Sequence, residues 1–176
     1  MALVKSIAGN EICDTVARNA QVGGRNLLLN TAKPCSIKGT NSTNQCYTPY
    51  PISPSLGGKL PSGRVSFSVY VTYSGDSTAG RFVLQGSGPY WQNVTGTNTV
   101  NVKDIGSGIR LKGTTTIQAG KQDNNVQIRM DNVTGTITFS EMKFERGDKA
   151  TDWTPALEDT LTMTDDNNGN VTISIL

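Results

Sequence analysis

The chain has 176 residues, of which 35% are hydrophobic and 17% are charged, and its 16 Lys and Arg against 14 Asp and Glu give a formal net charge of +2. This length suits one domain with short appendages, and the composition is neither charged enough for disorder nor apolar enough for a membrane protein. The near balance of charge argues against nucleic acid as a partner, and the absence of histidine argues against His-dependent hydrolases and zinc enzymes.

The N-terminal stretch, residues 1–22, predicts a short helical segment. Asn10 can cap a helix over residues 10–20, and Gly23 with Gly24 would end it. Polar residues such as Lys5 interrupt the apolar ones, so the stretch lacks the pattern of a secretory signal, and no window of the sequence is apolar enough to cross a membrane. We therefore expect a soluble chain that is made in the cytoplasm and has no membrane partner.

The three cysteines, Cys13, Cys35 and Cys46, have no C-x-x-C spacing, which argues against a zinc ribbon or a thioredoxin-like pair. Cys35 and Cys46 could close one loop as a disulfide. The alternative, three reduced and partly buried thiols, is favoured for a chain without an export signal.

The clearest strand covers residues 65–73, where Val65, Phe67, Val69, Val71 and Tyr73 alternate with Ser66, Ser68, Tyr70 and Thr72. A strict period of two is typical of a strand with one face in the core and the other in water.

Two later segments, residues 109–112 and 126–130, show the same alternation. Ile109 and Leu111 alternate with Arg110 and Lys112, and Val126, Ile128 and Met130 alternate with Gln127 and Arg129. Each segment predicts a half-buried strand with a solvated face.

In the segment 133–145, apolar residues occupy alternate positions through Phe139. From Met142 onward the apolar positions are displaced by one residue. A single inserted residue changes the inward face of a strand, so we expect a β-bulge near Ser140 and Glu141. Short strands with one apolar face each must stack on another sheet or close into a barrel. The sequence thus predicts an all-β protein with a two-sheet β-sandwich.

The C-terminal residues 160–176 predict a β-hairpin, with residues 165–170 as its turn. The acidic turn does not fit an EF-hand: with Gly169 at the sixth loop position, Thr164 would be first and Ile175 twelfth. We expect no metal site and no cofactor. The last strand is β-branched and uncharged, so we expect it to pair with the sandwich or with another subunit.

Aromatic residues in loops suggest a binding surface for sugars, because a ring can cover the apolar face of a sugar while amides and guanidinium groups bind its hydroxyls. The alternative is that these rings cap the core beneath their loops. A second candidate surface is the solvated strand faces, if their strands are neighbours. The candidate carbohydrate-binding residues are Tyr47, Tyr50, Tyr90 and Trp91 in loops, and Tyr70, Arg110, Gln127 and Arg129, with Lys112, on strands.

The carboxylates do not single out a catalytic pair. Asp76, Asp104, Asp123, Asp131, Glu141 and Glu145 have no spacing typical of glycoside hydrolases. We therefore expect no catalytic residues and no enzyme activity.

Two segments resemble a known family. Residues 24–31 (GRNLLLNT) and 142–159 (MKFERGDKATDWTPALED) are similar to segments of bacteriophage and prophage minor tail and baseplate proteins that carry a carbohydrate-binding-module-like jelly roll. The second segment is the more specific one, and it has Leu157 where the family usually has proline. The resemblance implies a galactose-binding-like sandwich, with Trp153 as a structural plug and Asp152 and Thr154 fixing the last crossover.

These observations together predict three parts: an N-terminal helical segment (1–22), a carbohydrate-binding-module-like sandwich (23–159) and a C-terminal hairpin (160–176). The resemblance implies a place in the virion tail, with host cell-surface polysaccharide and other tail proteins as partners, and we expect a homo-oligomer built through the chain ends. Two alternatives remain open: a purely architectural tail module, and a polysaccharide-cleaving enzyme.

Overall fold

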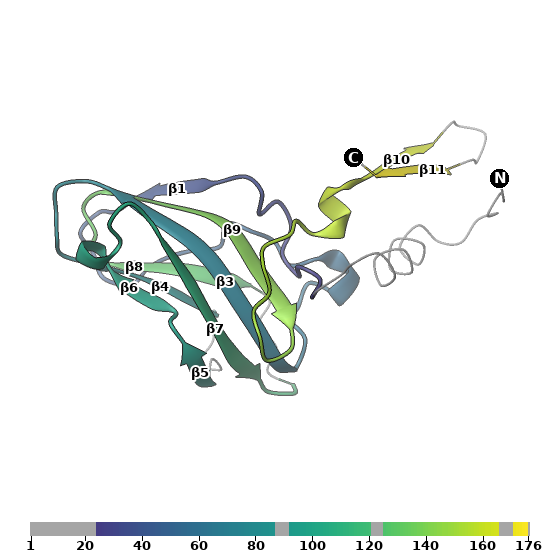
Figure 1. Ribbon diagram of the computed structural model, residues 1–176, viewed down its shortest axis with the longest axis horizontal. Coiled ribbons are helices and arrows are strands. Elements are labelled where there is room, and N and C mark those ends of the chain that lie inside the picture. The colour runs from purple at the N-terminus through teal and green to yellow at the C-terminus, as the bar shows by residue number, and fades with distance from the viewer. Residues whose placement is uncertain (1–23, 87–91, 121–124, 166–170, 176) are drawn as a thin grey trace.

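The computed structural model describes residues 24–86, 92–120, 125–165 and 171–175 and shows an all-β chain (Figure 1). Two antiparallel sheets of five and four strands form a sandwich, with the strand orders β1-β9-β3-β7-β5 and β2-β8-β4-β6. The strands are β1 (Cys35–Lys38), β2 (Gln45–Tyr47), β3 (Gly63–Ser74), β4 (Arg81–Gly86), β5 (Gln92–Gly96), β6 (Thr99–Asn101), β7 (Ile109–Ile117), β8 (Val126–Asp131), β9 (Thr136–Arg146), β10 (Leu161–Asp165) and β11 (Val171–Ile175). The predicted fold class is confirmed.

The chain changes sheet at every step from β1 to β9, so that odd-numbered strands form one sheet and even-numbered strands the other. This is jelly-roll connectivity, and it makes neighbours of strands that are far apart in sequence. For example, β1 pairs with β9, with Cys35 opposite Phe139. Three short 3-10 turns, η1 (Pro54–Leu56), η2 (Val102–Asp104) and η3 (Leu157–Asp159), lie in the connections.

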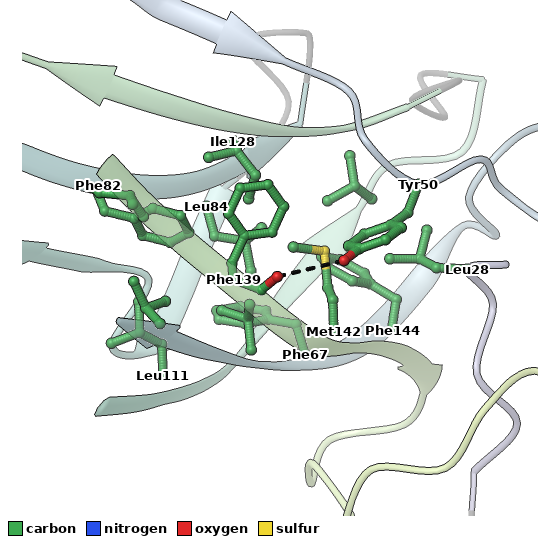
Figure 2. Close-up of a cluster of buried hydrophobic side chains, with 14 of the residues drawn as sticks. Leu28, Tyr50, Phe67, Phe82, Leu84, Leu111, Ile128, Phe139, Met142 and Phe144 are labelled. Atoms are coloured by element: carbon green, nitrogen blue, oxygen red, sulfur yellow. Dashed lines mark hydrogen bonds between the residues drawn. The ribbon is translucent and has the colours of Figure 1, made fainter. Parts of the chain in front are cut away.

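The inner faces of the two sheets form one apolar core (Figure 2). In β3, the alternating residues Val65, Phe67, Val69 and Val71 are fully buried, as their period predicts. Phe67 stacks on Phe144 of β9 at 5.8 Å between ring centroids. Facing residues from the four-stranded sheet include Phe82, Leu84, Val126, Ile128 and Met130.

Tyr50 also lies in this core, with 4% of its surface exposed. Its ring packs edge-on against Phe139, and its hydroxyl donates a hydrogen bond to the Lys33 carbonyl at 2.6 Å. Burial raises the pKa of Tyr50 to about 12, so the hydroxyl stays a donor. The expectation that a loop presents Tyr50 at the surface is wrong, because the bridge between Leu28 and Ile52 holds this segment against the core.

Strand β9 contains the expected β-bulge. Its pairing with β3 shifts register between Ser68 and Tyr70, opposite Lys143 and Ser140. Glu141 has a φ of 50°, a left-handed conformation that lets two residues of β9 oppose one of β3. The bulge turns Glu141 outward while Phe139 and Met142 both remain in the core.

The outer face of β3 is not fully solvated, contrary to expectation. Ser66 is fully buried and Ser68 is 1% exposed. Their cross-strand partners, Glu145 and Lys143, are also buried, because the chain after β9 folds back over them. Thr151 donates hydrogen bonds to Glu145 from its backbone and from its hydroxyl, and it also accepts one from Lys143 at 2.7 Å.

The two family-like segments meet at a buried set of polar contacts, which we call the Asn26 junction. The Asn26 amide nitrogen donates to the Thr31 hydroxyl at 3.0 Å and to the carbonyls of Met142 and Thr154 at 3.0 and 3.2 Å. Its amide oxygen accepts from the backbone N–H groups of Leu28 and Phe144 at 3.2 and 3.1 Å. Asn26, which is fully buried, therefore joins the opening segment, the bulge and the closing segment.

Strands β10 and β11 pair only with each other and extend away from the sandwich (Figure 1). The helix expected over residues 10–20 lies outside the described residues. Cys35 and Cys46 are both free thiols, so the optional disulfide between them is absent. In the part of the chain that the structure describes, no helix has the length and apolarity needed to span a membrane.

The Asn26 junction predicts a large effect for Asn26→Asp, a change that preserves side-chain size. A carboxylate would face three acceptor oxygens without donating to them, so we expect a loss of about 3–5 kcal/mol in the free energy of unfolding at pH 7. Urea denaturation followed by circular dichroism measures this loss. The same change at the exposed Asn41 should alter stability by less than about 0.5 kcal/mol. Equal, small effects at both positions would contradict the importance of the junction.

Candidate functional site

The structure separates the strand-borne candidate residues. Tyr70 on β3 and Arg110 on β7 are cross-strand partners in the five-stranded sheet. Gln127 and Arg129 lie on β8, in the four-stranded sheet. These strands are not neighbours, because β7 and β8 are consecutive in sequence but belong to different sheets. The strand-borne candidates therefore do not form a single binding platform.

The aromatic candidates are also dispersed. Tyr47 lies on the edge strand β2 opposite Ile128, and it is half-buried against the core rather than presented by a loop. Tyr50 is in the core, as described above. Tyr90 and Trp91 lie outside the described residues.

A hollow of about 310 Å³ opens on the outer face of the five-stranded sheet, and we call it the Trp153 hollow. It lies where the closing segment crosses strands β3, β7 and β9. The residues that line it are Ser68, Arg110, Lys112, Glu141, Asp152 and Trp153.

Arg110 is held in this hollow from two sides. Its guanidinium lies over the ring of Tyr70 at 5.4 Å from the centroid, a cation–π arrangement. It also forms an ion pair with the Glu141 carboxylate and donates to the Glu141 carbonyl at 3.1 Å. The bulge supplies both contacts, because only an outward Glu141 can reach across to β7.

Trp153 is fixed at the opposite wall. Its indole N–H donates to the Thr31 hydroxyl at 3.1 Å, and the flanking carbonyls of Asp152 and Thr154 accept from Lys143 at 2.9 Å and from Asn26 at 3.2 Å. These bonds fit the structural role that the resemblance implied for residues 152–154. They leave the half-buried indole as a wall of the hollow.

The hollow combines an aromatic surface with charges of both signs. Lys112 lies 3.7 Å from Asp152 across its mouth, and both side chains are largely exposed. Such a set can pack against a sugar ring and exchange hydrogen bonds with hydroxyls as donor and as acceptor. Among the candidates that the structure describes, Arg110 and Lys112 line this hollow, and Tyr70 packs against Arg110. Glu141, Asp152 and Trp153 were not among the carbohydrate-binding candidates predicted from the sequence. The closing motif, residues 142–159, contains Asp152 and Trp153 and was a signal for these two.

A second hollow, of about 340 Å³, lies on the four-stranded sheet where β4 begins and β8 ends, and we call it the Arg81 hollow. At its base Asp131, 4% exposed, accepts hydrogen bonds from Arg81 at 2.8 Å, from Arg129 twice at 2.9 Å and from the Asn44 N–H at 2.7 Å. Burial raises the pKa of Asp131, but these hydrogen bonds outweigh it and lower the pKa to about 2.

The described ranges contain no group of three His, Cys, Asp or Glu side chains that could hold a metal ion.

Comparison with known proteins found no matching family model and no match among curated sequences. Similar solved structures include the following two. One is the tripod (BppUct-A-L) from the baseplate of bacteriophage Tuc2009, with a TM-score of 0.46, 16% identity and coverage of 88% of this chain and 66% of that chain. This chain thus spans just under two thirds of that protein's length.

The other similar structure is the endo-1,4-beta-D-xylanase 10B of Clostridium thermocellum, comprising CBM22-1 and GH10 modules in complex with xylohexaose. Its TM-score is 0.38 at 16% identity, with coverage of 73% of this chain and 29% of that chain. Similar structures therefore include a phage baseplate protein and a chain with a carbohydrate-binding module.

The contacts of Asp131 predict a pH-dependent contribution to stability. Because its pKa in the folded chain is about 2, below the ordinary value of 3.8 for an aspartate, its contribution is complete above about pH 4 and is lost as the pH falls toward 2. We expect Asp131→Asn to lower the free energy of unfolding by about 2 kcal/mol at pH 7 and by much less near pH 2. Urea denaturation at both pH values tests this, and a deficit independent of pH would contradict it.

Proposed function

We propose that this chain is a tail-associated protein of a phage or prophage whose β-sandwich binds a host cell-surface polysaccharide without cleaving it. The place in the virion tail follows from the resemblance of residues 24–31 and 142–159. The Asn26 junction supports this resemblance, because the two segments form one buried hydrogen-bonded unit there.

The observation that carries glycan binding is the Trp153 hollow. It brings an indole, two cations and two carboxylates from β7, β9 and the closing segment to one hollow. Arg110 and Trp153 are held in place before any ligand arrives, because Arg110 lies between Tyr70 and Glu141 and the Trp153 indole is bonded to Thr31. Preorganised side chains reduce the entropy lost on binding.

The ion pairs support binding rather than catalysis. Glu141 is paired with Arg110, and Asp152 with Lys112. Both carboxylates are engaged by cations of β7, whereas glycoside hydrolysis needs one carboxyl group that gives a proton to the leaving oxygen.

A second, architectural role is favoured by the hairpin β10–β11. An isolated two-stranded hairpin is marginally stable in water, and this one has no strand partner in either sheet among the described residues. We propose the division into residues 1–22, 23–159 and 160–176, with the last part making contacts to a second copy or to other tail proteins.

Because Trp153 lines the proposed binding site, its fluorescence can report the binding of a polysaccharide. In a Trp91→Phe chain, Trp153 is the one remaining tryptophan, and saturable quenching of its fluorescence by one of a panel of purified bacterial wall polysaccharides is expected. Lys112→Ala should weaken this binding about tenfold, because it removes a donor at the mouth of the hollow.

Lys103→Ala is the matched control, since Lys103 is equally exposed but follows β6 of the other sheet, and it should bind as the parent chain does. The proposal fails if no polysaccharide alters the fluorescence, or if both lysine variants lose affinity alike. Release of reducing ends over time would instead support the enzyme alternative.

The architectural role predicts that deletion of residues 160–176 lowers the oligomeric mass while the sandwich stays folded. Light scattering after size-exclusion chromatography measures the mass, and circular dichroism reports the β-structure. An unchanged mass for a folded, shortened chain would argue against assembly through the hairpin.

A further inference from the structure

The Arg81 hollow has chemistry that glycan binding at the Trp153 hollow does not use. It lies on the other sheet, and polar residues and one glycine line it: Thr43, Gly80, Arg81, Asn101, Arg129, Asp131 and Asn132. A side chain could not replace Gly80, because a Cβ there would lie 2.6 Å from the Asn132 carbonyl. The hollow is therefore built by a close approach of the start of β4 to the end of β8.

The charges in this hollow do not cancel. Two guanidinium groups share the single carboxylate of Asp131, which leaves one excess positive charge. The carboxylate of Asp104 is one step removed from the hollow, since it accepts a hydrogen bond from the Asn101 amide at 3.0 Å. Because Asp131 is held ionised by its hydrogen bonds, the arrangement of the two cations is constant across ordinary pH.

Both arginines retain donors for a ligand. Asp131 uses the Nε of Arg81 and the Nε and Nη2 of Arg129, whereas a guanidinium carries five N–H donors. Within the described part of the chain, the hydrogen bonds of these two side chains go to Asp131. Their side chains are 50% and 30% exposed, so the remaining donors reach solvent.

We propose that the Arg81 hollow binds an anionic group, a phosphate or a carboxylate. Two guanidinium groups held by a buried carboxylate match such a group in charge and in planar donor geometry. The amides of Asn101 and Asn132 at the rim add neutral hydrogen-bonding groups for the hydroxyls beside it. This site stands independently of the Trp153 hollow and of the tail assignment.

The test uses the full chain and four probes: inorganic phosphate, poly(glycerol phosphate), polygalacturonate and the neutral polymer dextran. Calorimetry should show saturable binding of at least one anionic polymer and none of dextran. Arg81→Gln should weaken this binding about tenfold, and Arg81→Lys should weaken it less, because the charge remains but the planar fork is lost.

Arg64→Gln is the matched control, because it removes the same charge at an exposed position on β3 of the other sheet, and it should bind as the unaltered chain does. Binding of the phosphate polymer or of the uronate polymer alone identifies the group. The proposal is overturned if neither polymer binds, or if Arg64→Gln and Arg81→Gln reduce binding equally.

A measurement on the unaltered chain tests the proposal without depending on whether a variant folds. In a nitrogen-15 NMR titration with the same polymer, the side-chain N–H signals of Arg81 and Arg129 should shift while the Trp153 indole signal does not. Shifts at Trp153 alone would overturn this proposal and support binding at the Trp153 hollow. The proposals for the two hollows can therefore be rejected separately.

Discussion

The buried amide of Asn26 is the contact on which the rest of the structure depends. A single side chain satisfies two backbone donors and three acceptors from segments more than a hundred residues apart. Burying so many polar groups without these bonds would be costly, so the opening segment, the bulge and the closing segment must come together at once. Thr31 extends the junction, because its hydroxyl also accepts from Trp153 and its carbonyl accepts from Glu141.

The Trp153 hollow and the Arg81 hollow form in a similar way but differ in chemistry. In each, an interruption of a strand turns a carboxylate toward arginine: the bulge in β9 presents Glu141 to Arg110, and the end of β8 presents Asp131 to Arg81 and Arg129. The first adds an indole and balanced charge, whereas the second adds amides and excess positive charge.

Local patterns explain what the sequence predicted well. Alternation along residues 65–73 and the change of parity near Glu141 are properties of single strands, and both are confirmed. Burial of Ser68, the core position of Tyr50 and the separation of Arg110 from Arg129 depend instead on which distant segments become neighbours. No single-strand pattern encodes that pairing, so part of the fold was predictable while the composition of the candidate site was not.

The ends of the sandwich lie side by side, since Arg25 pairs with Glu158 and the Asn30 N–H donates to Asp159 at 2.7 Å. A mechanical load applied through residues 24 and 160 would therefore act first on these few contacts. The hydrogen-bond ladders of the two sheets would carry tension only after the contacts had separated.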